Sequence, residues 1–310
     1  MPDNNRGILL LIEKSSHCLS YYDIASGSRL AEIALPDYPH EFVVDAERKF
    51  AYVGHYGIRT SADPSFGGTS IIVIDIAARK IVNTIDCRPF NRIHGMAMDK
   101  QGRLYGLSEG AAVMLVIESP STALAPSRAV PAGGIKSHLF ALSGDGRTAL
   151  CLNILTHTVT RINPQDATIQ PVSLMPGIKP EGLCLSQDER TLYVGNRGSN
   201  TISDIDTEKM VVRRSIPART DPTRIYDLRD GRLLVTHFSG RCMSIVDAAT
   251  LEEIAYRPLD GGAAAAAIDA ENDRFFISLD SNVSLEYKIS TLEQVSSFPT
   301  QLEPDCCVVL

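Results

Sequence analysis

A short segment recurs seven times along this chain of 310 residues, and it constrains the fold more than any other feature. Each copy is an apolar stretch of strand character, as in residues 39–45 and 180–186. The second position of the copies is occupied, in order, by His40, His94, His138, Glu181, Thr223, Ala264 and Asp305. These positions lie 54, 44, 43, 42, 41 and 41 residues apart, and a period of this length predicts a propeller or a solenoid.

Each copy carries further strands after the first. A charged turn leads into a second strand, such as residues 191–196, and a third strand ends on an acidic or polar residue. Tyr193 lies 13 residues before Asp206, and the same interval recurs in other copies. Short strands rich in β-branched and aromatic residues, separated by Gly, Asp and Asn turns, predict an all-β fold. Seven units of four strands make a seven-bladed β-propeller with antiparallel blades.

The two ends of the chain each supply part of a blade. Residues 7–35 contain three strands but no first strand, whereas residues 305–310 contain a first strand with nothing after it. We expect the N- and C-terminal strands to close the last blade together, because closure removes open sheet edges. No linker divides residues 1–310, so a single propeller domain is predicted.

Composition excludes several classes of function. A formal net charge of −7 argues against nucleic acid as a partner. No apolar stretch is long enough to span a membrane, and the apolar run near the start is too short for a signal peptide. Seven cysteines without a zinc-binding spacing favour reduced thiols, and hence a cytoplasmic protein. The sequence gives no indication of the oligomeric state.

One copy of the second strand resembles a known repeat. The segment Leu192-Tyr193-Val194-Gly195-Asn196 is similar to the YVTN repeat of seven-bladed β-propellers. The Asn of that motif is replaced by His55 in one copy and by His237 in another. The resemblance implies the propeller fold, and these departures lie where chemistry would be placed.

The column of repeated positions predicts a metal centre. Equivalent side chains of a propeller point toward one axis, so His40, His94, His138 and Glu181 are expected to form part of a ring. Three imidazoles and a carboxylate suit a divalent transition metal such as Fe, Zn, Mn, Ni or Cu. A ring of structural or substrate-contacting histidines is the alternative.

The remaining histidines are expected on the same face. His55 and His237 end second strands, and His17 and His157 lie in the loops that follow. Together with Asp305, which lies in the ring column, His55 and His237 are candidate proton carriers. Asp305 could instead be a metal ligand or a structural residue, and the sequence does not distinguish these roles.

Cations near the ring predict an anionic substrate. Arg92, Lys136 and Lys179 stand two residues before the ring column in three successive copies, and Arg224 follows Thr223. Such side chains attract a carboxylate or phosphate, although ordinary loop charge is the alternative.

An insertion within residues 57–69 follows His55, on the same face of the propeller as the histidines. Its glycines suit hinges, and Phe66 is placed to cover a bound ligand. A tolerated surface insertion is the alternative.

These features together predict a metal-dependent enzyme acting on a small anionic organic molecule at the axis of one face. Lyase, hydrolase and oxygenase chemistry all fit three histidines and a carboxylate. The site is similar to that of the carotenoid oxygenase class, which holds iron with four histidines, but Glu181 replaces the fourth. A metal-free hydrolase resembling seven-bladed lactonases and a non-catalytic binding module are the alternatives.

Overall fold

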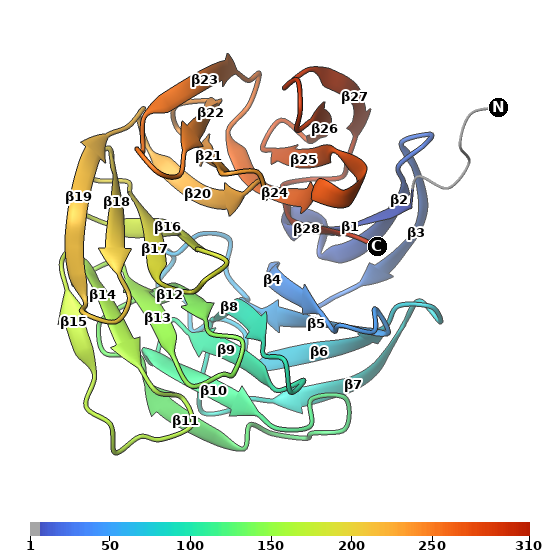
Figure 1. The fold of residues 1–310 in the computed structure, drawn as a ribbon. Coiled ribbons are helices and arrows are strands. Elements are labelled where there is room, and N and C mark those ends of the chain that lie inside the picture. Colours follow the sequence, from blue (N-terminus) through green and yellow to red (C-terminus); the bar gives the residue numbers. More distant parts are fainter. Residues whose placement is uncertain (1–6) are drawn as a thin grey trace.

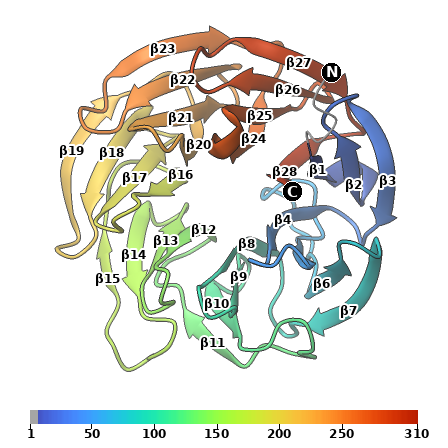
Figure 2. The same ribbon diagram turned by 45° about the vertical axis from the view of Figure 1, so that its right-hand side comes forward.

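The expected strands form in the structure, a computed structural model that describes residues 7–310 of the chain. They make seven four-stranded antiparallel sheets arranged around a central axis (Figures 1 and 2). The inner strand of each sheet contacts the inner strand of the next, so the ring is continuous. The predicted all-β, seven-bladed propeller with four-stranded antiparallel blades is therefore confirmed.

Each blade is built from four strands that follow one another outward from the axis. The inner strands are β4 (Pro39–Val44), β8 (Ile93–Met98), β12 (Ser137–Leu142), β16 (Pro180–Leu185), β20 (Pro222–Asp227), β24 (Ala263–Asp269) and β28 (Pro304–Val309). The second strands are β5 (Phe50–His55), β9 (Leu104–Ser108), β13 (Ala149–Asn153), β17 (Thr191–Asn196), β21 (Arg232–His237), β25 (Arg274–Leu279) and β1 (Ile8–Glu13).

The third and fourth strands form the outer half of each blade. The third strands are β6 (Ser70–Asp75), β10 (Val113–Ile117), β14 (Thr158–Ile162), β18 (Thr201–Asp206), β22 (Cys242–Asp247), β26 (Val283–Lys288) and β2 (Cys18–Asp23). The outer strands are β7 (Lys80–Asp86), β11 (Arg128–Pro131), β15 (Val172–Leu174), β19 (Val211–Pro217), β23 (Glu253–Pro258), β27 (Gln294–Pro299) and β3 (Ser28–Ala34). Two short 3-10 turns, η1 (Lys14–Ser16) and η2 (Ala270–Asn272), complete the described elements.

The closing blade joins both ends of the chain, as expected. Its strand order is β28-β1-β2-β3, with Leu9 opposite Val309 and Leu10 opposite Val308. The C-terminal strand thus supplies the inner position that the N-terminal strands lack.

A β-bulge begins every inner strand. In β4, Pro39 pairs with His55 and Phe42 pairs with Val53, so one more residue lies on the inner strand than on its partner. The same shift of register occurs in the other six blades. Because a bulge redirects side chains, two consecutive residues of one strand can face the axis.

Neighbouring inner strands approach one another closely around the axis. A Cβ atom on Gly195, the glycine of the YVTN-like segment, would lie 2.7 Å from the carbonyl oxygen of Pro222. A Cβ on Gly54 would likewise lie 2.8 Å from the carbonyl oxygen of Ile93. These glycines therefore allow the next blade to pack against the end of the second strand.

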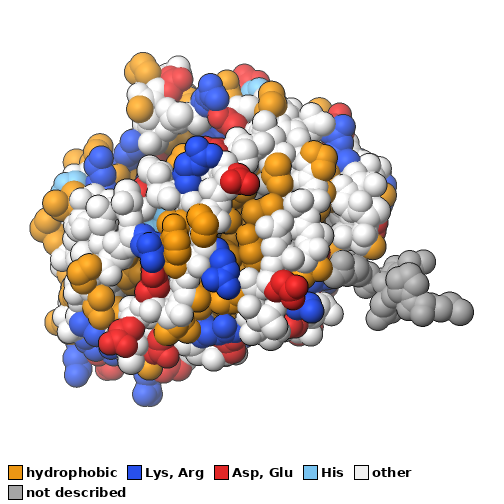
Figure 3. Space-filling view, turned by 90° about the horizontal axis from the view of Figure 1, so that it is seen from above, with side chains coloured by type: hydrophobic (Ala, Val, Ile, Leu, Met, Phe, Trp, Pro, Cys, Tyr) orange, Lys and Arg blue, Asp and Glu red, His pale blue; other side chains and the backbone are white. Residues whose placement is uncertain are grey.

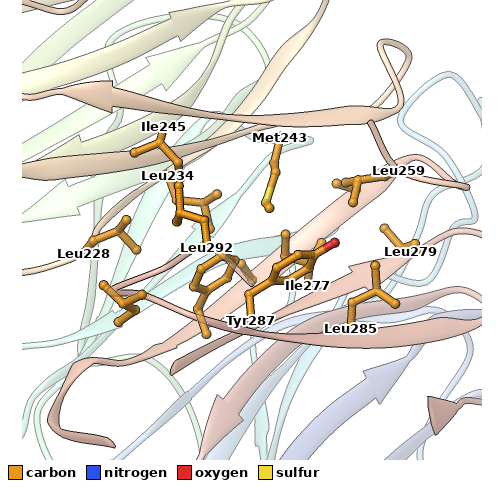
Figure 4. Close-up of a cluster of buried hydrophobic side chains, with 14 residues drawn as sticks. Leu228, Leu234, Met243, Ile245, Leu259, Ile277, Leu279, Leu285, Tyr287 and Leu292 are labelled. Atoms are coloured by element: carbon orange, nitrogen blue, oxygen red, sulfur yellow. The ribbon is translucent and has the colours of Figure 1, made fainter. Parts of the chain in front are cut away.

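Apolar side chains fill the space between adjacent blades. Figure 4 shows one such cluster, in which Leu234, Met243 and Ile245 pack with Ile277 and Tyr287 of the next sheet. Outer strands carry several of the exposed apolar residues, among them Ile254 and Val295, and loops carry others. Figure 3 shows hydrophobic side chains interspersed with charged ones on one side of the molecule. Within residues 7–310, no helix has the length and apolar character needed to cross a membrane.

Replacing Gly195 with Val should destabilise the ring. The added side chain would overlap the backbone of Pro222, and overpacking of this kind costs about 1–3 kcal/mol. Chemical denaturation should show this loss in the free energy of unfolding. Thr236→Val is the matched control at the equivalent position of another blade, because the buried Thr236 hydroxyl makes no hydrogen bond to any described residue. Equal stability of the two variants would contradict the close-packing argument.

Candidate active site at the propeller axis

A cavity of about 320 Å³ lies on the axis, at the end where the inner strands begin. Six members of its wall come from the ring column: His40, His138, Glu181, Thr223, Ala264 and Asp305. The lining also contains the cations Lys14, Arg59, Arg197 and Arg224. A larger hollow of about 1010 Å³ lies at the opposite ends of the inner strands, but no histidine lines it.

A second ring of side chains completes the site. Its members directly follow the last residue of each second strand, and Lys14, Tyr56, Ile154, Arg197 and Phe238 of this ring line the cavity. Glu109 occupies the same position in its blade and is buried beside them. Sequence reasoning missed this ring, because it followed the Asn position of the YVTN-like motif and not the residue after it.

The three ring histidines lie side by side. The ring centroids of His40 and His94 are 4.3 Å apart, and those of His94 and His138 are 3.7 Å apart. Tyr56 contacts His40 and His94 edge-on. Burial lowers the pKa of His40 to about 3 and holds the pKa of His94 well below its usual value, so both imidazoles are neutral at neutral pH.

His138 is oriented by a buried carboxylate. Its Nδ1 lies 2.7 Å from Oε2 of Glu109, and the hydroxyl of Tyr56 donates to Oε1 of Glu109 at 2.8 Å. Burial alone would raise the pKa of Glu109, but the bonds from His138 and Tyr56 hold it below its usual value. The Nε2 atom of His138 is left facing Glu181, whose Oε1 lies 3.8 Å away. This arrangement fixes the ring, and no residue in the described part of the chain makes a hydrogen bond to Nε2.

Two guanidinium groups, those of Arg197 and Arg224, pair with carboxylates in the site. Arg197 donates to Oε2 of Glu181 at 2.6 Å and pairs with Asp221. Arg224 donates to Oε1 of Glu41 at 2.9 Å and lies 3.7 Å from Glu181. Burial would lower the pKa of Arg224, but the charge of Glu41 and other nearby groups raises it, so this buried residue stays charged.

Asp305 lies between a histidine and a lysine. Its Oδ2 is 3.2 Å from Nδ1 of His40 and 3.7 Å from Nζ of Lys14. Burial would raise the pKa of Asp305, but the neighbouring His40 and Lys14 hold it below its usual value. Asp305 is therefore a buried carboxylate in contact with the ring, in agreement with its predicted position.

The donor atoms that gather most closely differ from the predicted set of four. His40, Glu41 and His94 bring their potential ligand atoms within 4.8 Å of one another. His138 is instead bonded to Glu109, and Glu181 is bonded to Arg197. The difference arises from the bulge, which turns Glu41 as well as His40 toward the axis.

His55 and His237 lie inside their blades and do not line the cavity. Nδ1 of His55 is 3.3 Å from the Ser70 hydroxyl, and Nε2 of His237 is 2.8 Å from the Ser244 hydroxyl. Asn196 bonds the third strand in the same way. Both histidines thus take the position of a structural Asn and lie outside the axial cavity, where proton carriers were expected.

His17 also has a structural environment. Its Nδ1 accepts a hydrogen bond from the backbone N–H of Tyr38 at 2.9 Å. Asn200 makes the equivalent bond to Asp221 at 2.8 Å. His17 lies at the same end of the propeller as the ring histidines, as predicted. Its contact with Tyr38, however, only stabilises the loop before the next inner strand.

The predicted substrate-binding cations have different partners. Arg92 donates to the carbonyl oxygens of Asp63 and Ser65, both at 2.7 Å, and Lys136 donates to that of Ser61 at 3.0 Å. Both cations therefore anchor the insertion over the cavity.

The residues of the insertion that line the cavity do not include Phe66, the residue expected to cover a ligand. Arg59, Thr60 and Ser61 line the wall, whereas the side chain of Phe66 is 64% exposed and Lys179 is exposed outside the cavity. Phe66 therefore does not cover the cavity in this structure. Arg224 does line the cavity, as predicted.

The structure is similar to several solved propellers, although no protein-family model and no curated protein matches the chain. A protein of unknown function from Desulfotomaculum acetoxidans DSM 771 has a TM-score of 0.80 at 14% identity, covering 98% of each chain. A candidate 6-phosphogluconolactonase from Bacteroides uniformis ATCC 8492 has a TM-score of 0.78 at 16% identity, covering 97% of this chain and 98% of that one. A second candidate 6-phosphogluconolactonase, from Bacteroides fragilis NCTC 9343, has a TM-score of 0.76 at 14% identity, covering 99% of each chain. At these identities the likeness establishes the propeller fold.

Removing Asp221 should destabilise the protein in a pH-dependent way. Burial would raise the pKa of Asp221, but hydrogen bonds from Arg197 and Ser239 hold it below its usual value. A lowered pKa stabilises the fold above the unfolded value of about 4 and loses that contribution as the pH falls through the folded value. Asp221→Asn should therefore cost about 1–3 kcal/mol at neutral pH, and less on acidification.

The measurement is the free energy of unfolding across the acidic range. Asp260→Asn, at an exposed position, is the control and should match the wild type. A difference between wild type and Asp221→Asn that grows as the pH falls would contradict the argument.

Proposed function

We propose that this protein hydrolyses a small anionic ester, such as a lactone, in the axial cavity. The observation that carries the proposal is the pair formed by His138 and Glu109 at the cavity wall. A carboxylate that bonds one imidazole nitrogen holds the ring and leaves the other nitrogen free to accept a proton. This arrangement suits a general base that activates water.

The proposed reaction needs two proton transfers through His138. Nε2 removes a proton from water as the water oxygen attacks the ester carbonyl carbon, and the carbonyl electron pair moves onto its oxygen. When the carbon–oxygen bond to the leaving group breaks, Nε2 returns the proton to the leaving alkoxide. The carbonyl re-forms as the bond breaks, and the products are one alcohol and one carboxylic acid, which releases its proton to solvent to give the carboxylate; the two groups are joined in one molecule if the substrate is a lactone.

The charges around the cavity support an anionic substrate. Among the lining residues, four cations face two carboxylates, Glu181 and Asp305. Arg197 and Arg224 lie beside Glu181, so they are close enough to the proposed base to stabilise an oxyanion that forms there. Lys14 and Arg59 lie elsewhere on the wall and would hold the anionic group of the substrate.

Similar structures are compatible with this proposal. Two of them are described as candidate 6-phosphogluconolactonases, and a phosphorylated sugar lactone is a small anionic ester. The chain shares the propeller fold with them at low identity, so the proposal depends on the site. A non-catalytic binding role is the other candidate, and it would use the same cationic wall to hold an anion without turnover.

His138→Ala should abolish most of the hydrolysis. Loss of a general base lowers the turnover number by about 10²- to 10⁴-fold. The measurement is kcat on a panel of phosphorylated and carboxylated lactones. Glu109→Gln should lower kcat with little change in KM, because the amide cannot hold the same charged hydrogen bond.

His17→Asn is the matched control for these variants. Asn200 makes the bond that His17 makes, so this change should preserve both the loop and the activity. A wild-type protein that binds these lactones without turnover would contradict the proposal and favour the binding role. Undiminished kcat in His138→Ala would exclude His138 as the base.

A further inference from the structure

We infer that His40, Glu41 and His94 bind one divalent transition-metal ion beside the axial cavity. Their potential ligand atoms lie within 4.8 Å of one another. The set differs from the four ligands expected from the repeat, because it includes Glu41 and leaves out His138 and Glu181. It does not rest on the proposed hydrolysis, and its test is a measurement of metal binding.

His94 is the strongest sign of a missing ligand. The side chain is fully buried, and within residues 7–310 neither of its ring nitrogens makes a hydrogen bond. Leaving a buried polar atom unpaired costs about 1–3 kcal/mol, so two such atoms on one ring are expensive. Buried polar groups in native proteins almost always have a partner, which can be an ion. A metal bound to one nitrogen of His94 would provide that partner.

The bulge at the start of β4 brings two of the three donors together. It turns the consecutive side chains of His40 and Glu41 toward the axis, where His94 lies against His40. Two neutral imidazoles and one carboxylate form a donor set that binds Fe, Zn and related ions and leaves positions open for water or substrate.

Asp305 has the position of a residue that orients a metal ligand. Its Oδ2 lies 3.2 Å from Nδ1 of His40, a nitrogen that makes no hydrogen bond of ordinary geometry within residues 7–310, and Nε2 of His40 would then bind the metal. Ligating histidines commonly direct their other nitrogen to a carboxylate, which fixes the ring and increases its basicity. Asp305 is thus a positioning residue in this inference.

The positive charge of Arg224, which lies against Glu41, would repel a metal cation bound there. Arg224 bonds Oε1 of Glu41, and no hydrogen bond to Oε2 of Glu41 is recorded among residues 7–310. Oε2 is therefore the atom that would bind the metal. Arg224 also lies 3.7 Å from Glu181, so it has a second carboxylate to turn to when the ion is bound. With Asp305, three carboxylates surround this one guanidinium and offset the added charge.

The test is metal binding by the full chain after removal of metal with a chelator. Titration with Zn²⁺, followed by calorimetry, should give one ion per chain, and Co²⁺ should change its visible absorption on binding. His94→Thr should weaken Zn²⁺ binding by about 100-fold or more, since even the loss of a residue that orients a ligand costs 10- to 100-fold. Thr is chosen because Thr223 occupies the same position of its blade.

Two further variants keep the test decisive. Glu41→Gln should also weaken Zn²⁺ binding, and it serves if His94→Thr does not fold. His17→Asn is the control and should bind Zn²⁺ as the wild type does. Absence of stoichiometric binding, or equal affinity in the wild type and both ligand variants, would overturn the inference. A wild-type protein that binds Zn²⁺ but hydrolyses none of the lactones would count against the proposed function alone.

Discussion

The extra residue at the start of each inner strand determines what the propeller axis contains. Without a bulge, side chains alternate along a strand, and only one residue of each pair would face the axis. With it, the pairs His40–Glu41 and Thr223–Arg224 both reach the centre. Close packing of the blades at Gly54 and other glycines then brings these side chains into contact across neighbouring strands.

The polar side chains at the axis form a network in which charge is largely compensated. Arg197 joins Glu181 to Asp221, Arg224 joins Glu41 to Glu181, and Lys14 faces Asp305. Such fixed pairs keep the groups oriented before a ligand arrives, which favours both binding and catalysis. His94 and His40 differ from the rest of this network: within residues 7–310, both ring nitrogens of His94 and Nδ1 of His40 are buried without a hydrogen bond.

The period of the repeat was enough to predict the fold, the closure of the last blade and the column of ring residues. Within that column, His40, His138 and Asp305 reach the cavity as expected. The sequence could not reveal Glu41, because an alternating strand would have turned it away from the axis. It also could not separate His55 and His237 from catalytic residues, since their hydrogen bonds to Ser70 and Ser244 depend on the pairing of strands within a blade. Tyr56 and Glu109 could have been identified from the sequence, because they directly follow the YVTN-like Asn position and belong to a second column of repeated positions.

The central claim is that water attacks an ester in the axial cavity. The most direct test is turnover of a phosphorylated lactone in water enriched in ¹⁸O, with mass spectrometry of the product. The account predicts one ¹⁸O atom in each product carboxylate. A product that forms without solvent oxygen would contradict hydrolysis and indicate an elimination.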